Sequence, residues 1–296
     1  MKKTSKPLLF FGTEDFSATS LEKLITANFN IQAVVTKPDS KKGRGHKLTQ
    51  PIVKTIANKH SIPVWQPNKV AEIKEEIKKI SQVAGVLVSY GKIIPQDILD
   101  LFTPGIINVH PSLLPKYRGP SPIESAILNG DEETGISIMQ LSINMDAGPI
   151  YCQQELVLNG TETKPHLYEK LSSLGADLLV NNLSAILEGE IQPKAQDEKK
   201  ATYCQLLTKQ DSSLDPQTMS ATECERHIRA YLGFPRSKIT IFGHKCIITA
   251  ASVAAAQSSA PLIIQCKNTS FLSIEKLIAP SGKLLDATTF LRGYKP

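Results

Sequence analysis

The chain has 296 residues, and its 41% of hydrophobic residues is ample for a folded core and too high for a disordered protein. No run of about 18 apolar residues occurs, so the sequence predicts no membrane-spanning helix. The apolar patch at 8–11 is also far shorter than the roughly 7–15 apolar residues that a signal peptide needs.

The net charge of +6 is unevenly distributed along the chain. Residues 1–60 carry eleven Lys and Arg against four Asp and Glu, residues 61–206 twelve against eighteen, and residues 207–296 eleven against six. A polyanion held by both basic ends would explain this pattern, because neutralised phosphates supply much of the affinity for nucleic acids. On charge alone, ordinary variation of surface charge is the simpler interpretation.

The five cysteines are odd in number and are never spaced as Cys-x-x-Cys. Such a pattern predicts neither a disulfide framework nor a zinc site, and we expect no metal. Unpaired thiols are typical of a reducing compartment, so the sequence predicts a cytoplasmic protein.

The first part of the chain alternates buried-strand patterns with helical ones. Apolar runs with little alternation predict strands at 8–11, 31–36, 83–89 and 105–109. Helical composition between them predicts helices at 16–27, 51–60 and 70–80. Strands that alternate with helices indicate a parallel sheet built from βαβ units.

The second part begins with a predicted helix at 122–128, strands at 136–141 and 150–157, and a long helix at 164–187. A polar stretch without apolar periodicity follows. After it, a helix at 221–231 precedes short β-like segments at 238–242, 245–253, 261–266 and 271–278, as in a small barrel or sandwich. We therefore expect a catalytic domain over 1–188, a linker over 189–206 and a smaller domain over 207–296.

Three polar residues stand out as candidates for catalysis. Asn108 and His110 lie two residues apart at the end of a predicted strand, so they share one side of it, and open α/β sheets place their sites at this edge. Asp146 follows in a second loop, where a carboxylate could orient the imidazole. A hydrogen-bond donor with a base is what acyl transfer to an amine requires. A core histidine bonded to backbone is the alternative for His110 alone, but the set of three favours a functional site.

Longer motifs carry a resemblance over essentially the whole chain. They are FFGTEDFSATSLEKL near the start, TKPDSKKGRGHKL, VSYGKIIP, NVHPSLLPKYRGPSPI, MDAGPI and LRGYKP at the end. In this order they resemble the methionyl-tRNA formyltransferase family. The resemblance implies a Rossmann-like formyltransferase domain followed by an OB-like β-barrel domain that binds tRNA. It also implies an enzyme that moves the formyl group of 10-formyltetrahydrofolate onto the methionine of initiator methionyl-tRNA for translation initiation, with a monomer as the simplest state.

The same resemblance implies a role for each residue of the candidate site. Asn108 donates a hydrogen bond to the formyl oxygen as it becomes an oxyanion, and His110 stabilises that charge. Asp146 positions His110, and either of these two could take the proton of the amine. The folate pocket is expected to be lined by Ser112, Leu113, Leu114 and Pro115, with the backbone around Tyr90 and Gly91 beside the pterin.

Two basic regions would bind the tRNA. The loop residues are Lys41, Lys42, Arg44 and Lys47, whose charges suit contacts with phosphate. The resemblance implies that this loop lies at the acceptor stem, with Arg44 as its most important residue. In the C-terminal domain, Arg226, Arg229, Arg236, Lys238 and Lys245 fit an OB-like surface for RNA. Two alternatives stay open: a formyltransferase for small amines or sugar nucleotides (or a formyltetrahydrofolate hydrolase), and an RNA-binding protein without activity.

Overall fold

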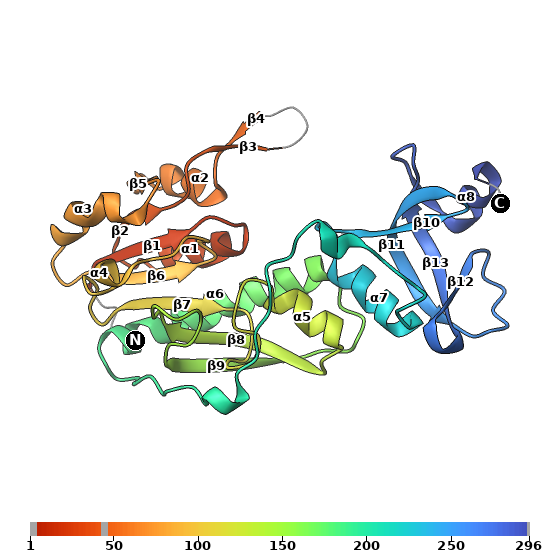
Figure 1. The fold of residues 1–296 in the computed structure, drawn as a ribbon. Helices are drawn as coiled ribbons and strands as arrows, with labels where there is room; N and C mark the ends of the chain where they lie inside the picture. Colours follow the sequence, from red (N-terminus) through yellow and green to blue (C-terminus); the bar gives the residue numbers. More distant parts are fainter. Residues whose placement is uncertain (1–4, 43–46, 295–296) are drawn as a thin grey trace. The chain divides into compact units, whose positions relative to one another are not determined.

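The computed structural model describes residues 5–42 and 47–294, which form two compact units (Figure 1). The first unit contains the described residues up to 119 together with 134–156 and 168–203. The second contains 120–133, 157–167 and the described residues from 204 onward. Two segments from the middle of the chain therefore belong with the C-terminal part, and residues 189–203 of the predicted linker belong with the first unit.

A seven-stranded sheet forms the centre of the first unit, in the order β5-β2-β1-β6-β7-β8-β9. The strands are β1 (Leu8–Gly12), β2 (Ile31–Val35), β5 (Val64–Trp65), β6 (Ala84–Val88), β7 (Ile106–His110), β8 (Glu133–Gln140) and β9 (Ile150–Val157). The pairs from β5 to β7 are parallel, and every residue of β1 and β7 is buried. Burial on both faces explains why these strands lack alternation in the sequence.

The helices of the first unit are α1 (Phe16–Thr26), α2 (Ile52–Lys59), α3 (Lys74–Lys78), α4 (Gln96–Leu99) and α6 (Lys164–Leu187), with a 3-10 turn over Val70–Ile73 before α3. Each buries an apolar stripe. In α2, for example, Val53, Ile56 and Ala57 are buried while Lys59 stays exposed. The two short strands β3 (Ser40–Lys42) and β4 (Lys47–Thr49) pair with each other as an antiparallel hairpin.

The second unit contains a five-stranded antiparallel sheet in the order β10-β11-β13-β12, with β14 beside β13. Its strands are β10 (Ser237–Ile241), β11 (His244–Ala254), β12 (Ile263–Cys266), β13 (Ser270–Ile278) and β14 (Leu284–Asp286), and its helices α5 (Pro122–Asn129), α7 (Ala221–Ala230) and α8 (Ala287–Gly293). Ile228 of α7 and Phe290 of α8 belong to one apolar core with Leu277 of β13. A capping box between Ser220 and Glu223 begins α7.

The predicted strands and long helices are confirmed to within a few residues, and three details differ. β8 pairs antiparallel with β7, so the sheet is mixed rather than wholly parallel. The helix predicted at 70–80 is a 3-10 turn joined to a short α-helix. The hairpin β3–β4 and the short strand β5 carry no clear sequence signal. None of the described helices is long and apolar enough to cross a membrane.

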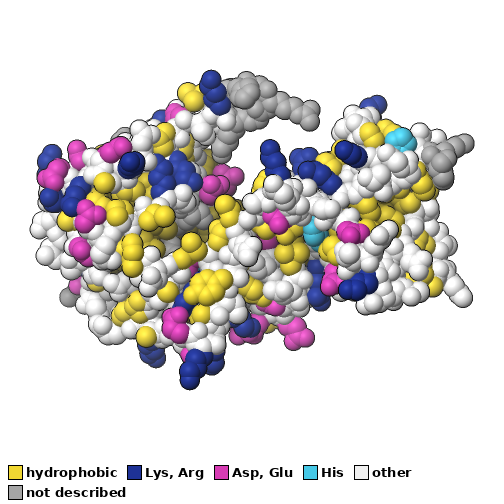
Figure 2. Space-filling model, viewed as in Figure 1, with side chains coloured by type: hydrophobic (Ala, Val, Ile, Leu, Met, Phe, Trp, Pro, Cys, Tyr) yellow, Lys and Arg dark blue, Asp and Glu magenta, His cyan; other side chains and the backbone are white. Residues whose placement is uncertain are grey.

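Lys and Arg side chains lie on both units in the face shown in Figure 2. Of the five basic residues expected to bind RNA in the C-terminal part, Arg236, Lys238 and Lys245 are exposed. Arg226 and Arg229 are half-buried, and Arg226 donates a hydrogen bond to the carbonyl of Asn129 and Arg229 to that of Glu162. These two side chains connect α7 to the segments that come from the middle of the chain.

Candidate active site

The end of β7 carries two of the three candidate catalytic residues. Asn108 lies opposite Leu87 of β6, and His110 lies opposite Ser137 of β8. Each is only 5% exposed. No side-chain hydrogen bond joins Asn108 to another residue in the described parts of the chain. Its amide therefore has no acceptor among these residues, and it is not one of the fully buried side-chain groups that lack a partner, so it is open to a ligand.

The ring of His110 contacts a carbonyl on one side and a carboxylate on the other. Nε2 lies 2.9 Å from the carbonyl oxygen of Tyr117. Because a carbonyl can only accept, Nε2 carries a hydrogen and donates it. Nδ1 lies 3.7 Å from Oδ2 of Asp146, close enough for an ion pair and too long for a direct hydrogen bond. Nδ1 is thus the nitrogen that can exchange a proton at the site.

Asp146 is held by a tight loop between β8 and β9. Its backbone has a φ of +49°, in the left-handed region that a residue other than glycine rarely adopts. Its Oδ2 accepts a hydrogen bond of 2.8 Å from the backbone N–H of Gly119. Two residues later, a Cβ at Gly148 would lie 1.8 Å from the carbonyl oxygen of Gln140, so only glycine fits. The structure therefore brings Asn108, His110 and Asp146 to one edge of the sheet, as expected from the sequence.

Side-chain hydrogen bonds stabilise the turn after His110. Ser112 Oγ donates to the carbonyl of Lys116 at 2.6 Å, and Ser137 Oγ donates to the carbonyl of Ser112 at 2.6 Å. The side chains of Ser112 and Leu114 are buried, with 0% and 3% exposed, whereas those of Leu113 and Pro115 are half-buried. Ser112 and Leu114 thus support the turn, and Leu113 and Pro115 are the members of this run with surface for a ligand.

Tyr90 and Gly91 follow β6 at the same edge of the sheet. The Tyr90 ring is completely buried and packs edge-on against Phe11 at 5.6 Å between ring centroids. Its hydroxyl has no hydrogen-bond partner among the described residues, and burial raises its pKa to about 12. The Tyr90 side chain thus belongs to the core, and a contact of the backbone here with folate stays a prediction. Its carbonyl already accepts from Thr13 Oγ1 at 3.1 Å.

The predicted tRNA loop is carried by the hairpin β3–β4. Lys42 pairs with Lys47 across the hairpin, Lys41 is exposed, and Arg44 lies outside the described residues. A polar cluster anchors the base of the hairpin: Lys54 Nζ lies 2.9 Å from both carboxylate oxygens of Asp39 and 2.8 Å from Gln66 Oε1. Hydrogen bonds from Gln66 and Lys54 hold the pKa of Asp39 below its ordinary value.

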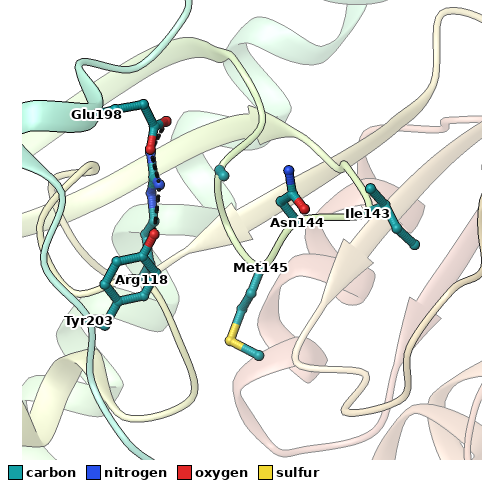
Figure 3. Close-up of a pocket in the computed structure, with 7 residues that line it drawn as sticks. Arg118, Ile143, Asn144, Met145, Glu198 and Tyr203 are labelled. Carbon is teal, nitrogen blue, oxygen red and sulfur yellow. Dashed lines mark hydrogen bonds and ion pairs between the residues drawn. The ribbon is translucent and has the colours of Figure 1, made fainter.

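A cleft of about 470 Å³ lies beside the Asp146 loop (Figure 3). Its lining combines loop residues with a charged cluster: Ile143, Asn144, Met145 and Ala147, and then Arg118, Glu198 and Tyr203. In Figure 3, Arg118 lies between Glu198 and Tyr203 and is bonded to both. No sequence pattern predicts this cleft, because its lining comes from three separate segments of the chain, at 118, 143–147 and 198–203.

Comparisons with known proteins decide the family. Residues 6–183 match the formyl transferase family. Methionyl-tRNA formyltransferase of Pelobacter propionicus is 34% identical over 301 residues, which cover 98% of this chain and 94% of that protein. The enzyme of Sulfurihydrogenibium sp. is 42% identical over 233 residues, covering 78% of this chain and 75% of its own length. The chain belongs to the methionyl-tRNA formyltransferase family.

Solved structures of formyltransferases have the same fold as this chain. An N-formyltransferase from Helicobacter canadensis, in complex with folinic acid and dTDP-3-aminofucose, matches with a TM-score of 0.68. It is 18% identical, and the match covers 92% of this chain and 99% of that one. At this identity the likeness shows the fold alone, and the predicted fold class, a Rossmann-like formyltransferase domain followed by a smaller β domain, is confirmed.

No group of three or more His, Cys, Asp or Glu side chains is placed to hold a metal ion in the part of the chain that the structure describes. The formyl donor of this family is a folate. The chemistry of the site therefore depends on how Asn108, His110 and Asp146 are held.

Proposed function

We propose that this protein transfers the formyl group of 10-formyltetrahydrofolate to the amino group of methionine on initiator methionyl-tRNA, yielding N-formylmethionyl-tRNA for translation initiation. The observation that carries the proposal is the grouping of Asn108, His110 and Asp146 at the end of β7, in a chain that aligns almost end to end with methionyl-tRNA formyltransferases. We further propose that it acts as a monomer in the cytoplasm.

The reaction needs stabilisation of one negative charge. The amine nitrogen attacks the formyl carbon and forms a new N–C bond. The electron pair of the carbonyl double bond moves onto the oxygen, which becomes an oxyanion. Asn108, whose amide has no acceptor among the described residues, donates a hydrogen bond to this oxyanion. Collapse of the tetrahedral intermediate re-forms the carbonyl and breaks the bond to N10 of the folate.

The reaction also moves one proton from the amine to the leaving N10. Tyr117 fixes the hydrogen on Nε2 of His110, so either Nδ1 of His110 or the Asp146 carboxylate, 3.7 Å from it, takes this proton and later returns it to N10. His110, charged while it holds the proton, also stabilises the oxyanion.

Binding of the two substrates is assigned to different surfaces. Leu113, Pro115 and the backbone at Tyr90 and Gly91 face the folate, while Ser112 and Leu114 hold the turn behind them. Lys41, Lys42 and Lys47 on the hairpin, together with Arg44, which lies outside the described residues, contact the acceptor arm of the tRNA, as phosphate-binding cations do in general. The exposed side chains of Arg236, Lys238 and Lys245 add charge for the RNA in the second unit.

A formyltransferase for sugar nucleotides is the second candidate, because the Helicobacter canadensis enzyme of this fold was solved with dTDP-3-aminofucose. Its sequence identity is 18%, against 34% over nearly the full length for a methionyl-tRNA formyltransferase. Lys41, Lys42 and Lys47 on the described strands of the hairpin also suit a polyanion better than a single nucleotide.

A panel of acceptors tests the proposal. Labelled 10-formyltetrahydrofolate is mixed with the protein and charged initiator tRNA, with an amino-sugar nucleotide, or with neither. We expect label on the charged tRNA only. Label on the amino sugar with none on the tRNA would support the second candidate, and release of formate without any acceptor would indicate a hydrolase.

A further inference from the structure

Gln196 contacts the loop that carries Asp146. Its Nε2 lies 2.7 Å from the carbonyl oxygen of Asp146 and 2.7 Å from that of Gly148. One side-chain amide therefore fixes the backbone on both sides of Ala147. Asp146 needs such support, since a left-handed backbone at a residue other than glycine persists only where its surroundings hold it.

The other end of the same amide is fixed by Arg118. Oε1 of Gln196 accepts hydrogen bonds from Nε and Nη2 of Arg118, at 3.0 and 2.8 Å. Because a guanidinium only donates, Oε1 must face Arg118, and Nε2 must therefore face the two carbonyls. The orientation of the amide follows from its partners.

Arg118 is itself held rigidly. It is completely buried, and its two terminal nitrogens lie 2.9 and 2.8 Å from the two carboxylate oxygens of Glu198. The hydrogen bonds that Arg118 donates to Glu198 and to Tyr203 raise its pKa above the ordinary value, so the guanidinium stays charged. Figure 3 shows this stack of Glu198, Arg118 and Tyr203 beside the cleft.

The neighbours of Arg118 hold the two catalytic side chains. Tyr117, before it, accepts the hydrogen bond of His110, and Gly119, after it, donates to the carboxylate of Asp146. Gln196 thus ties the turn that fixes His110 to the loop that bears Asp146. We propose that Gln196 is a positioning residue for formyl transfer, which sets the separation of His110 Nδ1 and Asp146 Oδ2 without touching a substrate. This inference rests on the proposed function.

The variant Gln196→Glu tests the role. A glutamate still accepts from Arg118, but its second oxygen would face two carbonyls that it cannot donate to, so the Asp146 loop must move. We expect kcat to fall about 100-fold, the usual effect of a shift of about 1 Å in a reacting group. KM for the tRNA and for the folate should each stay within about twofold, since neither substrate is bound by Gln196.

A matched control lies four residues earlier. Gln192 is exposed in the same segment, and its Nε2 donates to the carbonyl of Gly189 at 2.7 Å. Gln192→Glu adds the same charge and removes a hydrogen bond of the same kind, but it is not connected to the Asp146 loop by any hydrogen bond. We expect wild-type kcat for this control.

The outcomes separate the inference from the proposed function. A wild-type protein that formylates no methionyl-tRNA would refute the function. An active wild type with a Gln196→Glu variant of unchanged kcat, or with a raised KM alone, would overturn the positioning role only. If Gln196→Glu does not fold, Gln196→Met, which removes donors and acceptor without adding charge, is judged by the same criteria. If both variants are unfolded at the assay temperature, Gln196 contributes to the stability of the fold rather than to positioning, and the proposal is overturned as well.

Discussion

The carboxylate of Asp146 should contribute to the rate through its attraction for a proton held on His110. The two atoms, Nδ1 and Oδ2, are 3.7 Å apart, and the two side chains are 6% and 15% exposed. At this separation and an effective dielectric constant of about 20, the attraction between unit charges is about 4.5 kcal/mol. Losing it from the transition state would slow the reaction about 10³-fold. The variant Asp146→Asn removes this charge and keeps the shape.

The fold should survive this substitution, because the amide oxygen of an asparagine can still accept the N–H of Gly119. Single-turnover formylation of charged initiator tRNA at saturating folate measures the effect on the chemical step. Asp177→Asn is the control, since Asp177 forms a surface ion pair with Lys23 and its side chain is 58% exposed. A rate for Asp146→Asn within about tenfold of wild type would refute the electrostatic account, which asks for about 10³-fold.

Three further variants test other parts of the molecule. Gly148→Ala should lower the free energy of unfolding by about 1–3 kcal/mol in a denaturant titration, because its Cβ would overlap the carbonyl of Gln140; an unchanged midpoint would contradict this. Lys54→Met should raise KM for the tRNA about tenfold and leave KM for folate unchanged, since it frees Asp39 at the base of the hairpin; an equal rise in both constants would count against it. His227 is buried, and burial lowers its pKa from 6.5, so protonation favours the unfolded state and stability is lost as the pH falls below that value. Denaturant titrations at about pH 7.5 and about pH 5.5 should therefore show that the wild type loses more free energy of unfolding than the variant His227→Gln. The difference should be at most about 1.4 kcal/mol per pH unit, and equal losses in the two proteins would exclude this role of His227.

The strands of the catalytic site were predictable because their environment leaves a simple pattern. β1, β6 and β7 are buried almost throughout, and only continuous apolar runs suit such strands. The spacing of Asn108 and His110 then put both at one strand end, and β7 ends at His110 in the structure. Local sequence was sufficient here.

The direction of β8 was not predictable in the same way. Its residues are buried nearly as continuously as those of the parallel strands, so burial alone does not distinguish the two directions. The antiparallel pairing of Ser137 with His110 depends on the path of the chain between the strands. The hairpin β3–β4 was also missed, because its three-residue strands are polar and show no alternation.

Gln196 was missed because everything that defines it lies elsewhere in the sequence. It belongs to a polar segment without periodicity, which predicted a linker. Its partners are Arg118, Asp146 and Gly148, up to 78 residues away. Tyr90 shows the opposite case: its position in a family motif suggested a ligand, while its side chain is a core residue and only its backbone reaches the edge of the sheet.

The identity of the product tests the central claim most directly. Wild-type protein is incubated with 10-formyltetrahydrofolate and charged initiator tRNA, and the amino acid is then released from the tRNA and identified by mass spectrometry. The account predicts N-formylmethionine with wild-type protein and unmodified methionine when Asn108 or His110 is replaced by alanine. Unmodified methionine with the wild type, or full formylation by the His110→Ala variant, would contradict it.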